Sequence, residues 1–245
     1  MTSYHGGKQR IGERIAKTIV NESMQIEDDY DFKIKGYCEP FCGMMGVYRH
    51  IPRLFQKEGL DKLKYKAGDL NESVIKMWLS SKGKWKPSSD ITSRKQFMSL
   101  KGNGRSSSKK GFIGHMYGYG GQYFRPFRDG VSKNRLKRSI ENIKAISDET
   151  SNVSFSHGKY TQFSRLKNHI IYCDPPYRIQ SQYYDERDNR LCFDTDEFIQ
   201  WCIKMSAHNI VFVSEYKMPK EFDKIFSVKA KTLRADRIDN LYIIY

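Results

Sequence analysis

The sequence predicts an α/β protein with a mainly parallel sheet, an inserted segment and an antiparallel pair of strands at its C-terminal end. In residues 1–80 and 150–245, apolar runs of strand length alternate with segments of helical periodicity. Such alternation is typical of strand–helix–strand units, whose strands run parallel. Between these two parts the alternation stops, and residues 82–133 are instead rich in Gly, Ser, Lys and Arg.

The elements of the first part follow from apolar spacing. Ile11, Ile15 and Ile19 recur every four residues, which predicts a helix that ends in the acidic loop around Asp28. The further expected elements are a strand over 34–38, a helix from Val47 to Phe55, a strand over 63–67 and a helix from Val74 to Leu79.

Helical periodicity returns near the end of the insertion, and the sheet pattern resumes after it. A helix is predicted from Leu136 to Ile146, and a helix with Phe198, Trp201 and Met205 on one face has Thr195 as its expected cap. The predicted strands are 153–155, 170–173, 209–214, 225–231 and 241–245, of which the last two form the closing antiparallel pair.

Charge is concentrated in one segment of the 245 residues. The chain carries a net charge of +15, and residues 81–140 hold 15 of its 43 Lys and Arg but only two acids, Asp90 and Asp129. The local balance of +13 leaves the remainder of the chain almost neutral. A polyanionic partner is therefore expected at this segment.

The composition also limits the setting and the chemistry. No apolar stretch approaches the roughly 20 residues of a membrane span, and residues 1–7 lack the apolar core of a signal peptide. We therefore expect an intracellular, cytoplasmic protein. The five cysteines contain no C-x-x-C pair, and the six histidines are scattered, so reduced thiols and no metal site are predicted.

The tetrapeptide Asp174-Pro175-Pro176-Tyr177 follows an apolar run that ends at Cys173. The residue after a parallel strand lies where open α/β sheets bind ligands. Because proline lacks an N–H, the carbonyls of Asp174 and Pro175 can act with the Asp174 carboxylate as acceptors for an exocyclic amine. Tyr177 can then stack on the ring that carries the amine. An ordinary strand end with a proline turn and a capping Asp is the alternative interpretation.

Two glycine-containing turns could hold a nucleoside cofactor. Glu39-Pro40-Phe41-Cys42-Gly43 lies between a strand and a helix, and Asp69 at the end of the next strand could accept both ribose hydroxyls. Gly6-Gly7-Lys8 begins the first helix, where Gly7 permits close backbone approach and Lys8 could neutralise a carboxylate. An ordinary turn and a flexible terminus are the simpler interpretations of each motif taken alone.

The order of these motifs resembles that of the Dam-type DNA adenine-N6 methyltransferases. In that family a G-G-K segment, E-P-F-x-G, D-x-N, a target-recognition insertion and D-P-P-Y follow one another, and here the D-x-N segment is Asp69-Leu70-Asn71. Residues 193–219 resemble a branch common in phages and other viruses, so a bacterial, phage or viral setting is expected.

The resemblance implies a fold, a cofactor and roles. The fold would be a Rossmann-like class I methyltransferase sheet, with catalytic parts at 1–80 and 150–245 and a mainly helical or loop target-recognition insertion at 81–149. Tyr4 and Lys8 would pack on and pair with S-adenosylmethionine, the segment from Glu39 to Gly43 would wrap its methionine moiety, and Asp69 would hold its ribose. Asp174 would contact both cofactor and target amine, and adenine N6 in double-stranded DNA would attack the methyl group directly.

Three positions depart from the family pattern. The loop reads Gly43-Met44-Met45-Gly46 where many members show G-x-G, so the second glycine is displaced by one position. Tyr4 stands where many members have tryptophan, and Lys159 stands where relatives often carry an acid before the tyrosine. The loop path after Gly43 and the cofactor contacts near Lys159 are therefore left open.

The insertion combines basic residues with aromatics and glycines. Lys and Arg neutralise phosphates, glycines let the backbone approach them, and an aromatic can enter the stack left by a flipped base. The expected DNA-binding residues are Lys109, Lys110, Tyr117, Tyr119, Tyr123, Arg125 and Arg128. A solvated basic face with inward-packed aromatics is the alternative.

Other functions share parts of this pattern. Cytosine-N4 and RNA adenine-N6 methyltransferases use the same amine chemistry, and protein-glutamine methyltransferases use related tetrapeptides. A catalytically inactive DNA-binding homologue is a hypothesis of a different class, although Asp174, Lys8 and Asp69 argue against it. The recognition sequence, the oligomeric state and any restriction–modification partner do not follow from the sequence.

Overall fold

The computed structural model describes residues 7–177, 183–184, 190–191, 193–231 and 236–245. Its helices are α1 (Gly12–Tyr30), α2 (Ile51–Lys57), α3 (Glu72–Ser81), α4 (Arg94–Gly102), α5 (Ser108–Met116), α6 (Lys133–Glu149) and α7 (Thr195–Ser206). Its strands are β1 (Gly36–Glu39), β2 (Lys64–Asp69), β3 (Ser154–His157), β4 (His169–Cys173), β5 (Tyr183–Tyr184), β6 (Arg190–Leu191), β7 (Ile210–Glu215), β8 (Asp223–Lys231) and β9 (Asp236–Ile244).

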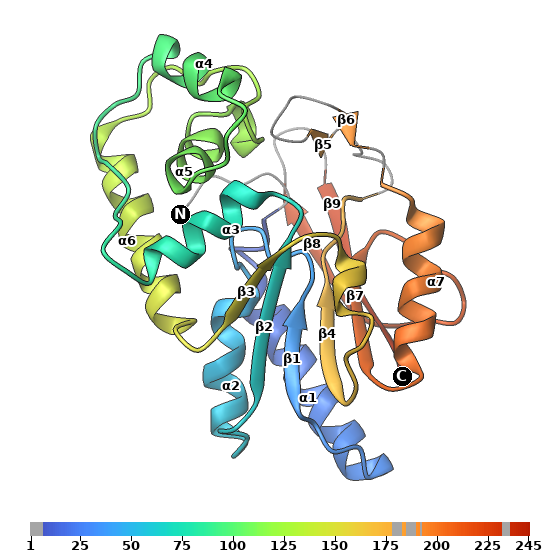
Figure 1. Cartoon of the computed structure of the whole chain (residues 1–245). Coiled ribbons are helices and arrows are strands. Elements are labelled where there is room, and N and C mark those ends of the chain that lie inside the picture. Colours follow the sequence, from blue (N-terminus) through green and yellow to red (C-terminus); the bar gives the residue numbers. More distant parts are fainter. Residues whose placement is uncertain (1–6, 178–182, 185–189, 192, 232–235) are drawn as a thin grey trace.

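Seven strands form one sheet in the order β3-β2-β1-β4-β7-β9-β8, and β5 and β6 form a separate pair. All neighbours from β3 to β7 are parallel, whereas β9 runs antiparallel to both β7 and β8. The strand order reverses between β1 and β4, which places a ligand-binding crevice at their carboxyl ends. This is the Rossmann-like sheet with a C-terminal antiparallel hairpin that the sequence predicted (Figure 1).

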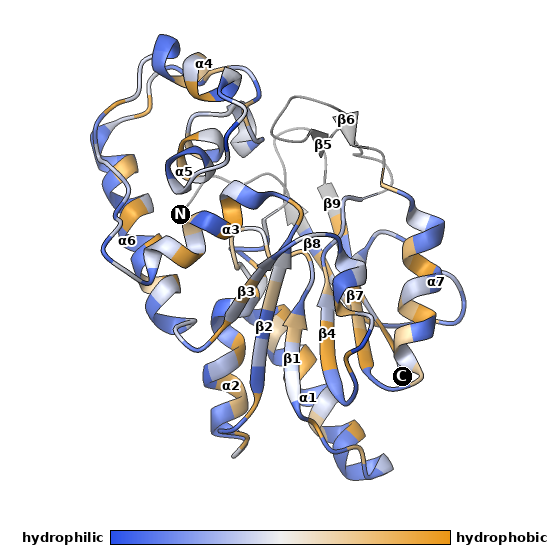
Figure 2. Cartoon of the chain, viewed as in Figure 1, coloured by the Kyte–Doolittle hydropathy of each residue, from blue (hydrophilic) through white to orange (hydrophobic). Residues whose placement is uncertain are grey.

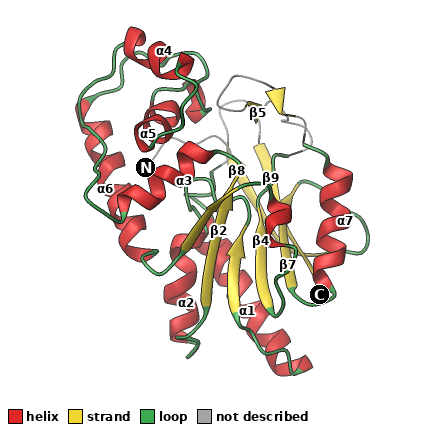
Figure 3. Cartoon of the chain, in the orientation of Figure 1, coloured by secondary structure: helices red, strands yellow, loops and turns green. Residues whose placement is uncertain are grey.

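The central strands are buried on both faces, because helices cover each side of the sheet (Figure 3). Alternate residues of a strand enter two apolar clusters. Ile170 and Tyr172 of β4 pack in the cluster that includes α1, whereas Ile171 and Cys173 pack in the cluster that includes α7. Figure 2 shows the resulting run of apolar residues along β4 and β7.

The polypeptide between α3 and β3 contains α4, α5 and α6, which lie together beside the sheet (Figure 1). Figure 2 shows hydrophilic residues interspersed with apolar ones in α4 and α6. The segment nevertheless has its own apolar contacts. Phe97 of α4 is 1% exposed, and its ring lies 4.8 Å from that of Phe124 and 5.2 Å from that of Phe127.

The structure corrects two local expectations. Asp194, rather than Thr195, caps α7, since its carboxylate accepts hydrogen bonds from the backbone N–H groups of Asp196 and Glu197 at 3.0 and 2.9 Å. Helix α4 was not predicted individually. A capping box of Ser93 and Gln96 begins it, so the S-x-x-Q pattern was a signal available in the sequence.

The described cysteines Cys38, Cys42, Cys173 and Cys202 are buried free thiols, and Cys192 lies outside the described residues. Within the part of the chain that the structure describes, no helix is both long enough and apolar enough to span a membrane.

Candidate active site

Four acids mark the carboxyl ends of four neighbouring parallel strands. Glu39 ends β1, Asp69 ends β2 and Glu215 ends β7. Asp174 directly follows β4. The acids are therefore gathered along the edge where the strand order reverses, which is the ligand-binding edge of an open α/β sheet.

Lys8 connects this edge to the start of the chain. Its ammonium donates to Asp174 Oδ1 at 2.8 Å and to the Tyr177 hydroxyl at 2.7 Å. The same nitrogen lies 4.6 Å from the centre of the Tyr177 ring. Lys8 is only 6% exposed, so this is a largely desolvated contact rather than a surface ion pair. Residues that are 166 positions apart thus form a closed triangle, which we call the Lys8 triangle.

The Lys8 triangle controls the charge of the tetrapeptide acid. Burial raises the pKa of Asp174, while the positive charge and hydrogen bond of Lys8 oppose that rise. Asp239 of β9 and the hydroxyl of Tyr177 act in opposite directions, since the acid raises the pKa of Asp174 and the hydroxyl lowers it. Lys8 therefore favours the carboxylate form, which accepts hydrogen bonds and does not donate them.

Glu39 is also buried, at 3% exposure. Burial raises its pKa well above the usual value, and the hydrogen bond that Tyr37 donates to Oε1 at 2.7 Å opposes this. The nearby charge of Asp174 raises the pKa of Glu39 further. The edge is therefore rich in acids around the ammonium of Lys8, which suits a ligand that brings positive charge.

Asp69 holds the loop after β1 in place. Its Oδ2 accepts from the backbone N–H of Gly43 at 2.9 Å, and its Oδ1 accepts from that of Asn71 at 2.8 Å. The indole N–H of Trp78 donates to the Gly43 carbonyl at 2.8 Å. Each oxygen of Asp69 keeps lone pairs for a further donor. Asn71, not Asp69, caps α3, since its side chain accepts from the backbone N–H of Val74.

The displaced glycine has a visible effect on this loop. Gly43 has φ 43° and Met45 has φ 57°, so a methionine adopts the left-handed conformation at the second position of the usual G-x-G. The Met45 side chain is fully buried in the apolar core, which offsets the strain. Gly46 instead packs closely on the chain after Lys8, because a Cβ added at Gly46 would lie 3.1 Å from the backbone nitrogen of Gln9.

Aromatic rings surround Phe41 beyond the loop. Tyr160 stacks on Phe41 with centroids 5.6 Å apart and planes 29° apart, and Phe193 and Phe198 meet Phe41 edge to face. Lys159, which replaces the acid common in relatives, is exposed beside this cluster. An apolar aromatic cluster next to the Gly43 loop is suited to a flat ring.

The structure brings together most of the predicted catalytic and cofactor residues. Lys8, Glu39, Gly43, Asp69 and Asp174 come from four separate segments and meet at one edge of the sheet. Half-buried Gly7 precedes Lys8, and buried Pro40 follows Glu39. Pro175 is buried and Pro176 is half-buried between Asp174 and Tyr177. Tyr4 lies outside the described residues.

Three residues at this edge were missed. Glu215 is 5% exposed. Like Asp174, it is an acid at the end of an apolar strand, and this pattern in the sequence could have identified it. The ring of Tyr216 packs edge to face on Tyr177 with centroids 4.8 Å apart. Asp239 acts on Asp174 from β9, and nothing in the sequence marked it, because only the antiparallel register brings it there.

The predicted DNA-binding residues separate by exposure. Tyr119 is 67% exposed and Lys109 is exposed, whereas Lys110 and Tyr117 are each 1% exposed. The ammonium of Lys110 donates to the Asn103 carbonyl at 2.8 Å, and the Tyr117 hydroxyl accepts from the N–H of Thr92 at 2.9 Å. Lys110 and Tyr117 therefore hold the insertion together. Tyr123, Arg125 and Arg128 are half-buried.

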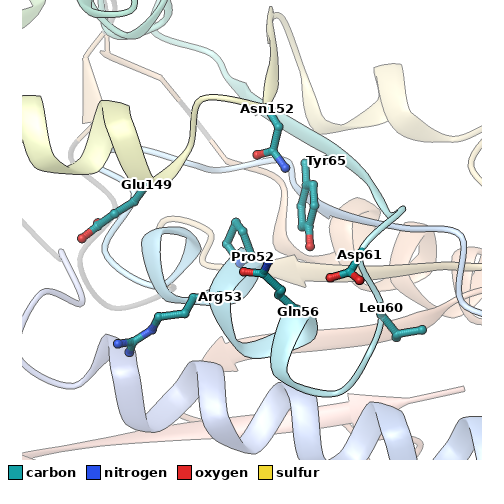
Figure 4. Close-up of a pocket in the computed structure, with 8 residues that line it drawn as sticks. All are labelled: Pro52, Arg53, Gln56, Leu60, Asp61, Tyr65, Glu149 and Asn152. Atoms are coloured by element: carbon teal, nitrogen blue, oxygen red, sulfur yellow. The ribbon is translucent and has the colours of Figure 1, made fainter.

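A cavity of about 310 Å³ lies elsewhere, and its lining includes Arg53, Tyr65, Glu149 and Asn152 (Figure 4). Tyr65 lies near the start of β2, at the end opposite Asp69. The cavity is therefore separate from the candidate active site.

Comparison with known proteins identifies the family of the chain. The sequence model of the D12 class N6 adenine-specific DNA methyltransferases matches residues 114–239, just over half of the chain. The chain therefore belongs to the D12 class N6 adenine-specific DNA methyltransferase family. It is thus an adenine-specific DNA methyltransferase with S-adenosylmethionine as its cofactor.

Two solved methyltransferases are among the structures to which the chain is similar. An rRNA methyltransferase, AviRa from Streptomyces viridochromogenes, is 10% identical, with 95% of this chain and 84% of that chain covered and a TM-score of 0.41. The magnesium protoporphyrin IX methyltransferase from Synechocystis PCC 6803 is also 10% identical, with 96% and 81% covered and a TM-score of 0.33. Neither similarity is strong enough to inform substrate or mechanism. No curated protein sequence matches the chain.

Proposed function

We propose that this methyltransferase acts at a specific sequence in double-stranded DNA, on an adenine that is turned out of the duplex into the strand-end site. The Lys8 triangle carries the proposal, because it places a half-buried carboxylate and an aromatic ring together at the switch point of the sheet. Chemistry on a base amine requires access that a stacked base does not give.

The cofactor fits beside this triangle. We assign the methionine moiety of S-adenosylmethionine to the loop from Glu39 to Gly43 and the ribose to Asp69, whose oxygens keep free lone pairs. Buried acids suit the positive charge of the cofactor, as the strand ends carry Glu39 and Glu215 in addition to Asp174. When bound, the cofactor supplies a methyl group on a sulfonium.

Asp174 is proposed as the residue that holds the target amine. Its carboxylate and the carbonyls around Pro175 accept from the N6 hydrogens and orient the nitrogen lone pair. The new bond joins N6 to the methyl carbon, the bond from that carbon to sulfur breaks with its electron pair on sulfur, and N6 then releases one proton. Positioning and exclusion of water supply most of the rate, and no covalent enzyme intermediate is required.

Tyr177 is proposed to stack on the adenine ring. In the structure the ring is 8% exposed, with the Lys8 ammonium over it and Tyr216 against it. Binding of the base therefore requires one of these contacts to open. Lys8 is the contact most easily exchanged, since an incoming cofactor carboxylate offers its ammonium another partner.

The helical insertion, residues 81–149, is proposed as the DNA-recognition part of the chain. Lys109 is exposed, and Tyr119 stands on a turn in which Gly120 and Gly121 have φ values of 64° and 78°. Exposed cations can neutralise phosphates, and an exposed aromatic on a glycine turn can enter the base stack. We also propose Tyr123, Arg125 and Arg128 as DNA-binding residues. We do not propose Lys110 and Tyr117, because both are buried. Because methylation of DNA requires contact with DNA, we also propose that the protein acts inside a bacterial, phage-infected or virus-infected cell.

The test is methyl transfer from labelled S-adenosylmethionine to duplex DNA, followed by identification of the labelled base. We expect label in N6-methyladenine within one sequence context. Asp174→Ala should abolish transfer while DNA affinity changes little, since Asp174 lies away from the exposed basic surface. Label in cytosine, in RNA alone or in no base would contradict the proposal.

A further inference from the structure

Tyr216 directly follows β7, and side chains form hydrogen bonds with both its backbone N–H and its backbone carbonyl. Its N–H donates to Glu215 Oε1 at 2.7 Å. Its carbonyl accepts from Asn240 Nδ2 at 2.8 Å and from the Tyr242 hydroxyl at 3.2 Å. Both donors come from β9, in which residues two apart share a face. A residue that has left the β7 ladder is therefore held in place by the neighbouring strand.

The orientation of the Asn240 amide is also fixed. Ser227 lies opposite Asn240 in the pairing of β8 with β9, and its hydroxyl donates to Asn240 Oδ1 at 2.7 Å. A carbonyl can only accept, so the amide must present its NH2 group to Tyr216. Hydrogen bonds thus connect Ser227 of β8 through Asn240 of β9 to Tyr216, at the end of β7.

Tyr216 passes this constraint to the tetrapeptide. Its ring meets that of Tyr177 edge to face, with centroids 4.8 Å apart and planes 82° apart. Lys8 contacts the same Tyr177 ring through its ammonium. Lys8 moves readily because of its long stem, whereas Tyr216 is tied by its backbone, so Tyr216 provides the fixed support of the Tyr177 ring.

We infer that Asn240 and Tyr242 are positioning residues for adenine methylation, which act through Tyr216 to hold the ring of Tyr177 at the angle that the target base needs. The inference rests on the proposed stacking of adenine on Tyr177. It assigns a role in the reaction to two further residues of the C-terminal antiparallel hairpin, in addition to the effect of Asp239 on Asp174.

The experiment compares Asn240→Asp and Tyr242→Phe with the wild-type chain. Asn240→Asp keeps the shape and the Ser227 bond but turns an acceptor toward the Tyr216 carbonyl, and we expect kcat to fall about tenfold. Tyr242→Phe keeps the ring and removes the longer bond, and we expect a loss of about threefold. The KM for S-adenosylmethionine should change less than about twofold, because neither side chain reaches the cofactor loop.

The matched control is Asn209→Asp, at the opposite end of β7. The Asn209 amide donates to the carbonyls of Leu166 and Met205, both at 2.9 Å, and it supports the fold away from the site. Each kcat is expressed per cofactor-binding site, so that only folded protein is counted. The melting temperature of each variant is measured beside it. Asn209→Asp should lower the melting temperature with kcat per site unchanged.

Two outcomes separate the claims. If the wild-type chain labels adenine but Asn240→Asp and Tyr242→Phe retain the kcat per site of the control, the positioning role is overturned and the proposed function stands. If the wild-type chain labels no adenine, the proposed function fails, and the inference fails with it.

Discussion

The strand-end site and the helical insertion use charge in opposite ways. Lys8 and Asp174 are paired at 2.8 Å and largely withdrawn from water. In the insertion, Arg94 and Asp129 also form an ion pair, at 3.0 Å, but their side chains are 66% and 75% exposed. The same kind of ion pair is thus desolvated in one region and solvated in the other.

The difference determines what each region can do. A desolvated pair fixes geometry and protonation, and it is sensitive to the loss of one partner. Solvated cations contribute small and additive energies that salt screens. Changes at the strand ends should therefore affect turnover strongly and independently of salt, whereas changes on the insertion should affect DNA affinity weakly and in a salt-dependent way.

Lys8→Met should have the largest effect of any single change that leaves the tetrapeptide intact. It removes the positive charge beside Asp174, so only the Tyr177 hydroxyl still opposes the rise in the pKa of Asp174 that burial causes. Because the proposed reaction uses the carboxylate, activity should be lost as the pH falls through this pKa, and the acidic limb of the pH–rate profile should move to higher pH. We expect kcat near neutral pH to fall about 10²-fold.

Lys17→Met is the matched control for this change. Lys17 lies on α1, is 57% exposed and pairs only with Glu13 among the described ion pairs. Its removal should leave both kcat and the acidic limb unchanged. An acidic limb that stays at the wild-type position in Lys8→Met would show that the triangle does not set the protonation of Asp174.

Asp69→Asn should have an intermediate effect, on cofactor binding. An amide cannot accept at both positions, so either Gly43 or Asn71 loses the acceptor for its backbone N–H. An unsatisfied buried donor costs about 1–3 kcal/mol, so the Kd for S-adenosylmethionine, measured by calorimetry, should rise about tenfold or more. DNA affinity should not change. Weakened DNA binding with normal cofactor affinity would contradict the assignment of Asp69.

The sequence located the acids Asp174 and Asp69 at strand ends because strand ends are local features. An apolar run followed by an acid locates Asp174 and Asp69, and parallel pairing brings such residues to one edge without further information. The sequence did not predict that Tyr216 and Asp239 lie at the site, because their contacts there are not local features. Their places depend on the register between β7 and β9, in which Glu215 faces Asn240, and local periodicity does not specify register.

The insertion shows a second limit. Lys109 and Lys110 are adjacent and chemically identical, and composition treats them alike. Both lie in α5, which turns successive side chains by about 100°, so one faces water and the other enters the core beside Phe124. Helical packing, which the glycine-rich sequence did not reveal, separates an exposed lysine that we propose as a DNA contact from a structural lysine.

This neighbouring pair provides the smallest but most selective test of the comparison. Lys109→Ala should weaken DNA binding about threefold at low salt and reduce the slope of log affinity against log salt by about one unit, without altering the melting temperature. Lys110→Met should instead destabilise the fold by about 1 kcal/mol, because the hydrogen bond to Asn103 is lost while the stem still packs. Its salt slope should match the wild type. If both variants reduce the salt slope equally, Lys110 reaches the phosphates in the complex, and the insertion must repack when it binds DNA.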